Sequence, residues 1–201
     1  MIKISKGLDL PISGSPVNTI SDEPKVSSVA LLSNDFIGMK PTMLVKEGET
    51  VKAGQKIFED KKNNGVYFTS LAGGIVKDIN RGDKRRFLSI EIDIKDTEEY
   101  VNFDMDDSVD QIKGCLIDSG LWNAFRTRPF NRTPGINEIP DAVFINCCDS
   151  NPLSMDPYEI ILLNKTEFDE GLNVLTNFFS CNINLCYQNQ DFDTSIEKIN
   201  Y

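Results

Sequence analysis

Closely spaced glycines between residues 47 and 76 are the feature that most constrains the fold of this chain. They separate short apolar runs, none of which is long enough to predict a helix. Glycine tolerates the backbone conformations of tight turns, and many short strands separated by turn residues are typical of small β barrels and sandwiches. Residues 88–94 alternate apolar and polar side chains, as a half-buried strand does, so we predict a β domain that this strand closes. The glycines are Gly48, Gly54, Gly65, Gly73 and Gly74.

The same stretch resembles the swinging-arm domains that carry lipoate or biotin on a lysine. Its halves, "VKAGQ" and "AGGIVKDI", flank "FEDKKNNG", where such a carrier has its hairpin tip. We therefore predict a barrel-sandwich hybrid fold of the biotinyl/lipoyl-like kind. Lys61 and Lys62 occupy the tip, but their context, Asp-Lys-Lys-Asn, matches neither the Asp-Lys-Ala nor the Met-Lys-Met of known carriers. We expect both lysines to be unmodified, and an unmodified carrier-type binding module stays open as an alternative.

Composition argues against several classes of function. The net charge is -10, from 31 acidic and 21 basic residues, so we expect no nucleic-acid partner, because phosphate binding needs a basic surface. The chain contains no histidine, and its five cysteines form no C-x-x-C pair. We therefore expect no metal site, no catalytic residue and no redox centre on this chain. No apolar stretch approaches the about 20 residues that cross a bilayer, which predicts a cytosolic or peripheral protein.

The second half of the chain has the pattern of an α/β domain. Ser108 and Gln111 are spaced as a capping box at the start of a helix, and Asp156 followed by Pro157 repeats a helix-start signal. A further helix is predicted from Thr166. Residues 142–147 and 183–187 are compact apolar runs suited to strands. Strand, helices and strand in this order predict a parallel pair joined by a crossover, as in Rossmann-like folds.

The predicted organisation is therefore multidomain, of the α+β class. Residues 1–27, rich in proline and glycine, are expected to form an extended lead-in. Residues 28–98 are assigned to the barrel-sandwich hybrid domain. Residues 99–201 are assigned to the Rossmann-like domain, which we expect to be truncated because only one crossover is evident. Nine acidic residues between positions 91 and 110 predict a solvated connection.

Four blocks of the sequence carry a resemblance to a known family. They are "KGLDLPISG" (6–14), the segment 29–85, "SGLWNAFRTRPFNRTP" (119–134) and "DSNPLSMDP" (149–157). Together they resemble the NqrA family, the A subunit of the bacterial sodium-translocating NADH:ubiquinone reductase. Members of that family are much longer, so the chain resembles their amino-terminal half.

The resemblance implies a peripheral subunit on the cytoplasmic side of the bacterial inner membrane, in a translocase that couples NADH-to-ubiquinone electron transfer to Na⁺ export. It implies that NADH, flavins and iron-sulfur are bound by other subunits. The implied partners are those other subunits, especially a membrane subunit, so that contact with the membrane is only indirect. By itself the chain is expected to be inactive.

An alternative comes from more distant relatives, the flavin-carrying subunit of complex I and the RnfC protein of the Rnf complex. These proteins place a glycine-rich loop after the first helix of their α/β domain, where backbone N–H groups approach a flavin phosphate. The corresponding residues here, 119–129, contain a single glycine and two large aromatics. We therefore expect flavin and NADH binding to be lost, and a flavin/NADH-binding subunit remains the alternative.

The segment 119–134 also contains the candidate site. Aromatic walls and arginine donors suit a quinone head group, since the rings cover its faces and a guanidinium binds a carbonyl oxygen. The plainer interpretation, which we prefer, is that the arginines pair with the protein's own carboxylates or with a neighbouring subunit while the aromatics pack an interface. The six candidates for quinone or partner contact are Trp122, Phe125, Arg126, Arg128, Phe130 and Arg132.

Overall fold

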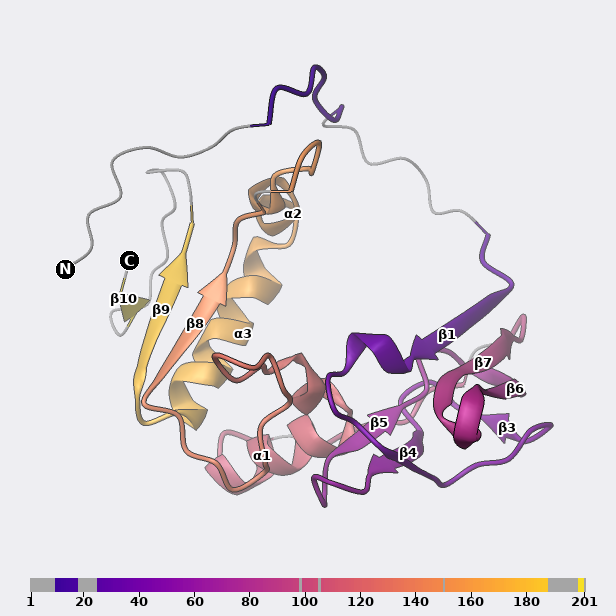
Figure 1. Cartoon of the computed structure of the whole chain (residues 1–201). Coiled ribbons are helices and arrows are strands. Elements are labelled where there is room, and N and C mark those ends of the chain that lie inside the picture. The colour runs from indigo at the N-terminus through magenta and orange to yellow at the C-terminus, as the bar shows by residue number, and fades with distance from the viewer. Residues whose placement is uncertain are drawn as a thin grey trace. The chain divides into compact units, whose positions relative to one another are not determined.

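A computed structural model describes residues 10–17, 25–97, 99–104, 106–149, 151–187 and 199–200. The chain divides into two compact units. One comprises Pro24–Ile139, and the other comprises Met1–Glu23 with Pro140–Tyr201. Figure 1 shows strands β1 to β7 in the first unit, and strands beside helices in the second.

The first unit is built on antiparallel strands, as the glycine spacing predicts. One sheet has the order β1-β7-β6-β3, and the other has the order β2-β4-β5. The strands of the first sheet are β1 (Ser28–Leu32), β3 (Thr50–Val51), β6 (Gly74–Arg81) and β7 (Phe87–Ile94). Those of the second are β2 (Pro41–Met43), β4 (Lys56–Asp60) and β5 (Tyr67–Thr69).

The core of this unit is made of apolar side chains from both sheets. The rings of Phe58 and Phe68 stack with their centroids 4.5 Å apart, and Phe87 meets Phe58 edge-on at 5.4 Å. Ile90 and Val76 are fully buried. Burial of these side chains from water is the main stabilising contribution to such a small barrel.

Strand β7 is confirmed, but its inward and outward faces differ from strict alternation. Leu88 is 37% exposed, whereas Ser89 is only 8% exposed. The pairing with β6 shifts register between Asn80 and Arg81, and such irregularities redirect side chains. Asn80 Nδ2 donates to Ser89 Oγ (3.0 Å), which satisfies the buried hydroxyl. The side chain of Leu88 lies instead over the backbone of Gly82.

A helix and a helical turn belong to the same compact unit as the barrel. Helix α1 (Val109–Asp118) begins at Ser108, whose side chain accepts a hydrogen bond from the N–H of Gln111 (3.3 Å), so the predicted N-cap is confirmed. Ile112 is the buried residue of its apolar stripe. The 3₁₀ turn η3 (Leu121–Ala124) follows.

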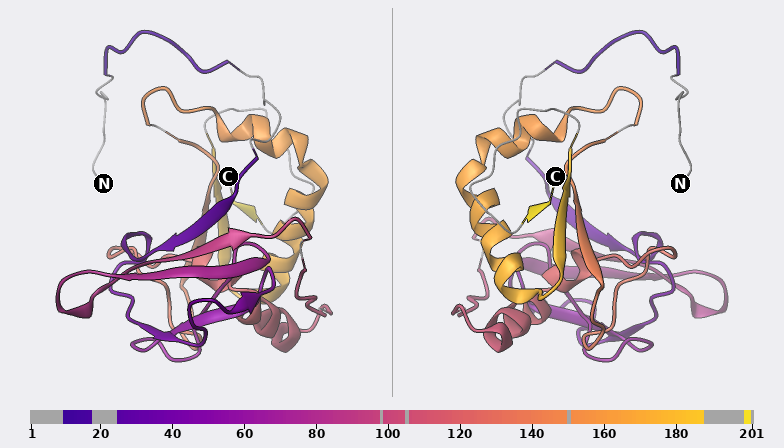
Figure 2. Two further views of the ribbon diagram at one scale, coloured as in Figure 1. Left: turned by 90° about the vertical axis from the view of Figure 1, so that its right-hand side faces the viewer. Right: turned by 90° about the vertical axis from the view of Figure 1, so that its left-hand side faces the viewer.

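The second unit contains the predicted parallel crossover. Strand β8 (Ala142–Asn146) pairs in parallel with β9 (Asn182–Cys186), and β9 pairs in parallel with β10 (Ile199–Asn200). Helices α2 (Pro157–Leu163) and α3 (Lys165–Phe178) connect β8 to β9. Figure 2 shows both helices on one side of the paired strands.

The helix starts and the packing of this unit agree with the sequence pattern. Asp156 caps α2 by accepting from the N–H of Tyr158 (3.0 Å), while α3 begins at Lys165, one residue before the predicted start. Leu172 of α3 packs with Cys147 and Leu185 at the centre of a cluster that also includes Phe168.

The lead-in is described only in part. Residues 10–17 and 25–27 lie outside any helix or strand, and the remainder of the 1–27 lead-in lies outside the described residues. The predicted domains 28–98 and 99–201, and the truncation of the second, stay predictions. The compact unit that contains the barrel extends to Ile139.

A substitution at Gly74 can test how closely strands β6 and β7 approach each other. A Cβ at this position would lie 2.1 Å from the backbone oxygen of Asp93, so we expect Gly74→Ala to lower the free energy of unfolding by about 3 kcal/mol. Urea denaturation measures it. Gly114→Ala is the matched control, because a Cβ there meets no atom within 4 Å and alanine stabilises a helix by about 0.5 to 1 kcal/mol. Equal effects of the two changes would contradict the packing described.

The raised pKa of the buried Cys147 thiol leads us to expect that the folded chain loses stability in alkaline solution. Burial raises the pKa of its thiol from 9.0 to about 11. An unfolded chain therefore releases this proton from pH 9 upward while the folded chain keeps it until about pH 11, so stability falls across that interval. As the pH rises between these two values, the free energy of unfolding should fall more for the native chain than for the Cys147→Ala variant. Urea denaturation at a series of pH values checks this, and parallel profiles would contradict it.

Candidate functional site

The segment that contains the six candidate residues leaves helix α1 against strand β5. Gly120 has a φ of +79°, in the left-handed region, and a Cβ there would lie 2.6 Å from Thr69 Oγ1. Glycine is needed for both reasons. The Thr69 hydroxyl donates to Ser119 O (2.9 Å). The segment therefore starts in direct contact with the barrel.

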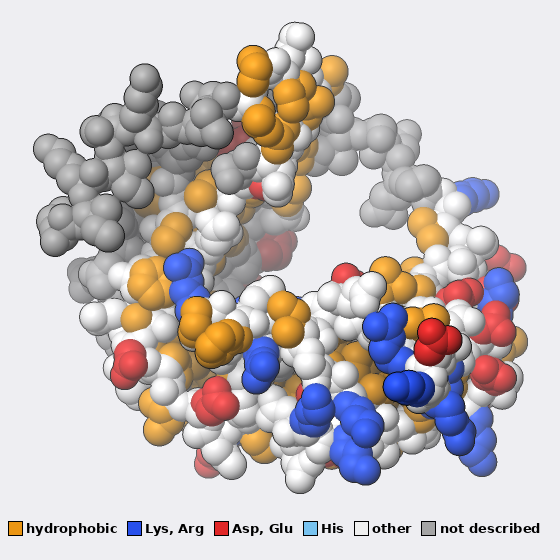
Figure 3. All heavy atoms as spheres, viewed as in Figure 1, with side chains coloured by type: hydrophobic (Ala, Val, Ile, Leu, Met, Phe, Trp, Pro, Cys, Tyr) orange, Lys and Arg blue, Asp and Glu red, His pale blue; other side chains and the backbone are white. Residues whose placement is uncertain are grey.

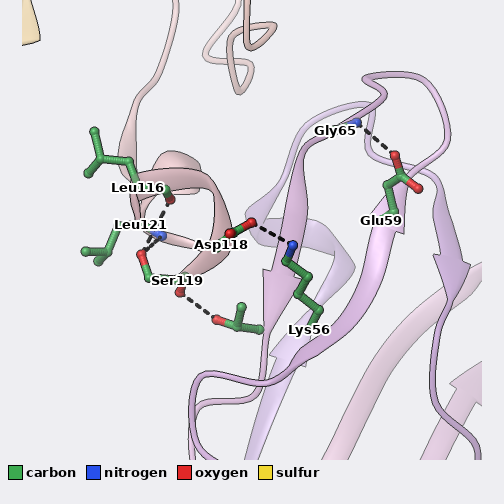
Figure 4. Close-up of polar contacts among 8 residues, drawn as sticks. Lys56, Glu59, Gly65, Leu116, Asp118, Ser119 and Leu121 are labelled. Atoms are coloured by element: carbon green, nitrogen blue, oxygen red, sulfur yellow. Dashed lines mark hydrogen bonds and ion pairs between the residues drawn. The ribbon is translucent and has the colours of Figure 1, made fainter. Parts of the chain in front are cut away.

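The end of helix α1 is tied to strand β4 by an ion pair. Lys56 Nζ lies 2.6 Å from Asp118 Oδ1 and 4.0 Å from the centroid of the Tyr67 ring. Figure 4 shows this pair beside Ser119, whose hydroxyl accepts from the N–H of Leu121 (3.4 Å). Both charges are partly exposed, so the pair contributes at most about 1 kcal/mol. It joins the last residue of α1 to strand β4.

Trp122 and Asn123 are buried in η3 and hold the segment in place. Trp122 is 3% exposed, and its Nε1–H donates to Pro134 O (3.0 Å). Asn123 Nδ2 donates to Tyr67 O (2.6 Å) and to Gly120 O (3.2 Å). Each bond satisfies a backbone carbonyl with a side-chain donor.

The hairpin tip with Lys61 and Lys62 supports the other end of the segment. Asn63 Nδ2 donates to Thr133 O (3.2 Å) and Pro134 O (3.0 Å), and the side chain of Ile136 lies against Gly65. The two lysines are exposed, and their modification state stays a prediction. We call the four residues whose side chains fix the segment the loop anchor. They are Asn63, Thr69, Trp122 and Asn123.

The tip itself is stiffened by two carboxylates. Asp60 Oδ1 accepts from the backbone N–H groups of Lys40 and Lys62, both at 3.0 Å, and Asp60 is 8% exposed. Glu59 Oε1 accepts from the N–H of Gly65 (2.8 Å), as Figure 4 shows. The hairpin at which a carrier presents its lysine here also contacts another part of the chain, through Asn63.

Arg126 contacts the segment and the barrel. Its Nη1 donates to Asn123 O and to Thr133 Oγ1, the latter at 3.1 Å. The guanidinium carbon lies 5.0 Å from the centroid of the Phe36 ring. Partial burial lowers the pKa of Arg126, and nearby Asp35 acts in the opposite direction. Phe125 packs edge-on against Trp122, with centroids 5.4 Å apart.

Residues 127–132 form a turn that presents the remaining candidates to solvent. Thr127 N donates to Arg132 O (2.8 Å), and Asn131, with a φ of +52°, donates to Thr127 O (2.8 Å). Phe130 is 68% exposed, and the guanidinium carbon of Arg132 lies 5.7 Å from its ring centroid. Arg128 is also exposed. We call this segment the Phe130 turn.

The structure thus separates the six candidates into two groups. Trp122, Phe125 and Arg126 lie in or next to η3, on the part of the segment that is bonded to the barrel. Arg128, Phe130 and Arg132 lie in the Phe130 turn. The remaining members of the loop anchor, Asn63, Thr69 and Asn123, were not among the residues that the sequence predicted. Isolated polar residues in a turn, a strand and a helical turn give no local signal that they bind backbone far along the chain.

The described residues show neither a metal-binding cluster nor a membrane-spanning helix. Over the described ranges, the side chains of Cys, Asp and Glu form no group of three or more that could hold a metal ion. Among the helices of that same part of the chain, none combines the length and apolar character needed to cross a membrane.

Two family models match this chain, one over each half. The NqrA N-terminal barrel-sandwich hybrid domain matches residues 2–95, and the NqrA second alpha/beta domain matches residues 107–201. The A subunit of the Na(+)-translocating NADH-quinone reductase of Photorhabdus laumondii is 50% identical over 194 residues, which is 93% of this chain. The chain belongs to the NqrA family. The resemblance described from the sequence is thereby confirmed, together with the fold class.

Other NqrA relatives agree. The protein of the same name from Klebsiella pneumoniae is 47% identical over 192 residues, and that from Actinobacillus pleuropneumoniae serotype 5b is 46% identical over 186 residues. They match 92% and 90% of this chain respectively. The chain spans only 41 to 43% of the length of these three relatives.

The division of the candidates predicts effects of very different size for two substitutions. Trp122→Phe removes the donor to Pro134 O and leaves space in a buried site, so we expect it to lower the free energy of unfolding by about 2 kcal/mol or more. Phe130→Ala changes an exposed side chain and should alter it by about 0.5 kcal/mol or less. Thermal or urea unfolding compares them. A larger loss for Phe130→Ala would mean that the turn, and not the anchor, holds the segment.

Proposed function

We propose that this chain is a portion of a peripheral subunit that supports the assembly of a redox-driven sodium pump. The pump transfers electrons from NADH to ubiquinone and couples this to Na⁺ export. In this proposal the chain lies on the cytoplasmic side of the membrane and contacts other subunits, especially a membrane subunit. It holds no redox centre, and NADH, flavins and iron-sulfur belong to other subunits. The names of its relatives support the first part of this proposal.

The Phe130 turn is the observation that carries the partner contact. An aromatic ring that is 68% exposed, next to Arg132, stands on a segment that is otherwise bonded to its own barrel. Aromatic side chains and arginine are enriched in protein interfaces and dominate their binding energy. The loop anchor fixes the backbone beneath the turn, so binding would cost little conformational entropy. We infer that Phe130 is the centre of a contact with a neighbouring subunit.

Ubiquinone contact is the second candidate, and the same turn favours it. A quinone ring can stack on the exposed face of Phe130 while a guanidinium of Arg128 or Arg132 donates to a carbonyl oxygen. Trp122 offers no free ring wall for this purpose, since it is buried and its N–H is bound to Pro134 O. The quinone candidate therefore rests on the turn, with Trp122 and Arg126 supporting it.

The assembly proposal predicts a loss of partner binding when the turn is changed. In a full-length tagged protein expressed in its own host, Phe130→Ala with Arg132→Gln should reduce co-purification of the membrane partners by about tenfold or more. The control is Leu71→Ala, which truncates an apolar side chain that is 58% exposed. Unchanged recovery with the double variant would contradict a contact through this turn, and isolation of the native protein without partners would contradict the assembly role.

The same variants separate the two candidates. If the turn contacts quinone, the assembled complex keeps NADH oxidation by artificial acceptors and loses quinone reduction. If the turn contacts another protein of the pump, both activities fall together with the amount of assembled complex.

A further inference from the structure

The turn between strands β6 and β7 concentrates positive charge in an acidic protein. Residues 81–86, "RGDKRR", contain four cations and one carboxylate, a local net charge of +3 (4 − 1), whereas the whole chain carries -10. The cations, Arg81, Lys84, Arg85 and Arg86, are all exposed. We call residues 81–86 the basic turn. Figure 3 shows several Lys and Arg side chains, with Asp and Glu side chains beside them, on the part of the surface where Figure 1 draws β6 and β7.

The backbone of the basic turn is strained at two of its cations. Lys84 has φ 53° and ψ 31°, Arg85 has φ 61°, and Arg86 N donates to Asp83 O (3.1 Å). Positive φ at both central residues is the geometry of a type I′ hairpin turn, for which Asn-Gly is strongly preferred. If stability of the turn were the only requirement, Asn-Gly would be expected here in place of Lys84-Arg85. Lysine and arginine in these positions are strained, and such strain is characteristic of functional segments.

The charges of the basic turn are not neutralised within the described part of the chain. The ion pairs found there join Lys52, Lys56, Lys77 and Lys165 to carboxylates, and none involves residues 81–86. Arg81 donates to Arg85 O (3.4 Å) and so braces the turn. The side chain of Leu88, 37% exposed, lies over Gly82 and forms an apolar surface next to the turn. Figure 2 shows the turn at the end of the two long strands.

We propose that the basic turn binds the anionic phospholipid headgroups of a membrane surface. This inference rests on the proposed function, which places the chain beside a membrane. Clustered Lys and Arg side chains are attracted to anionic lipid, and each contributes appreciably to binding. Because the remainder of the chain is strongly acidic, an anionic surface repels it and attracts this turn. The turn thereby determines which face of the protein approaches the lipid, and Leu88 can contact the headgroup region.

The test uses the purified 201-residue chain and vesicles of phosphatidylcholine with or without phosphatidylglycerol. Lys84→Asn with Arg85→Gly removes two cations and installs the preferred I′ pair, so it should raise the thermal stability while weakening binding to phosphatidylglycerol vesicles by about thirty-fold. The rise in stability excludes unfolding as the cause of lost binding. The native chain should lose binding as salt is added.

The matched control is Lys61→Gln with Lys62→Gln, which removes the same charge from another exposed turn. It should change binding by no more than about twofold. Absence of native binding to phosphatidylglycerol vesicles overturns the proposal, and so does equal weakening by both variants. Binding to polyglutamate without binding to vesicles would assign the turn to an acidic protein and also overturn it. Vesicle binding needs no other part of the pump, so its failure is distinct from failure of co-purification, which concerns the proposed function.

Discussion

The hydrogen bonds of the loop anchor are the interaction on which the attachment of residues 119–134 to the barrel depends. Asn63, Thr69 and Asn123 each donate a side-chain hydrogen bond that joins the β4–β5 hairpin to residues 119–134. Each such bond contributes only about 1 kcal/mol, but an acceptor left buried without a partner costs more. The bonds therefore act together with the burial of Trp122. They make a helix and a long loop part of the barrel.

This attachment gives the hairpin of a carrier-like fold a structural contact with another part of the chain. The hairpin tip that presents a lysine in lipoyl and biotinyl carriers supports a loop here. Asp60 and Glu59 stiffen the tip from within, and Asn63 binds the loop from its outer side. The Phe130 turn lies between the two parts of this segment that are bonded to the barrel, Asn123 and Thr133–Pro134. A fixed support of this kind suits recognition of a partner, because little motion must be lost on binding.

Local patterns predicted much of the fold, while the site depended on contacts between distant residues. Glycine punctuation indicated the short strands, and capping residues such as Ser108 and Asp156 located helix starts, because both signals lie within a few positions. The different contacts of the arginines could not be predicted: Arg126, although exposed, bonds to Thr133 and lies over the Phe36 ring, while Arg132 lies beside the Phe130 ring. Leu88 and Ser89 do not take their expected faces, because the pairing skips Leu88: Ser89 pairs with Asn80 and Phe87 with Arg81.

The loop anchor also determines where the chain can be cut for separate expression. A barrel ending near residue 98, where its strands finish, would lose Trp122 and the donor of Asn123 that covers Tyr67 O. It would also expose the surface of Gly65 that Ile136 covers. Such an excised barrel would present uncovered apolar groups and an unmet carbonyl, which favour self-association. A fragment that keeps the residues covering the barrel extends to Ile139, the end of the compact unit.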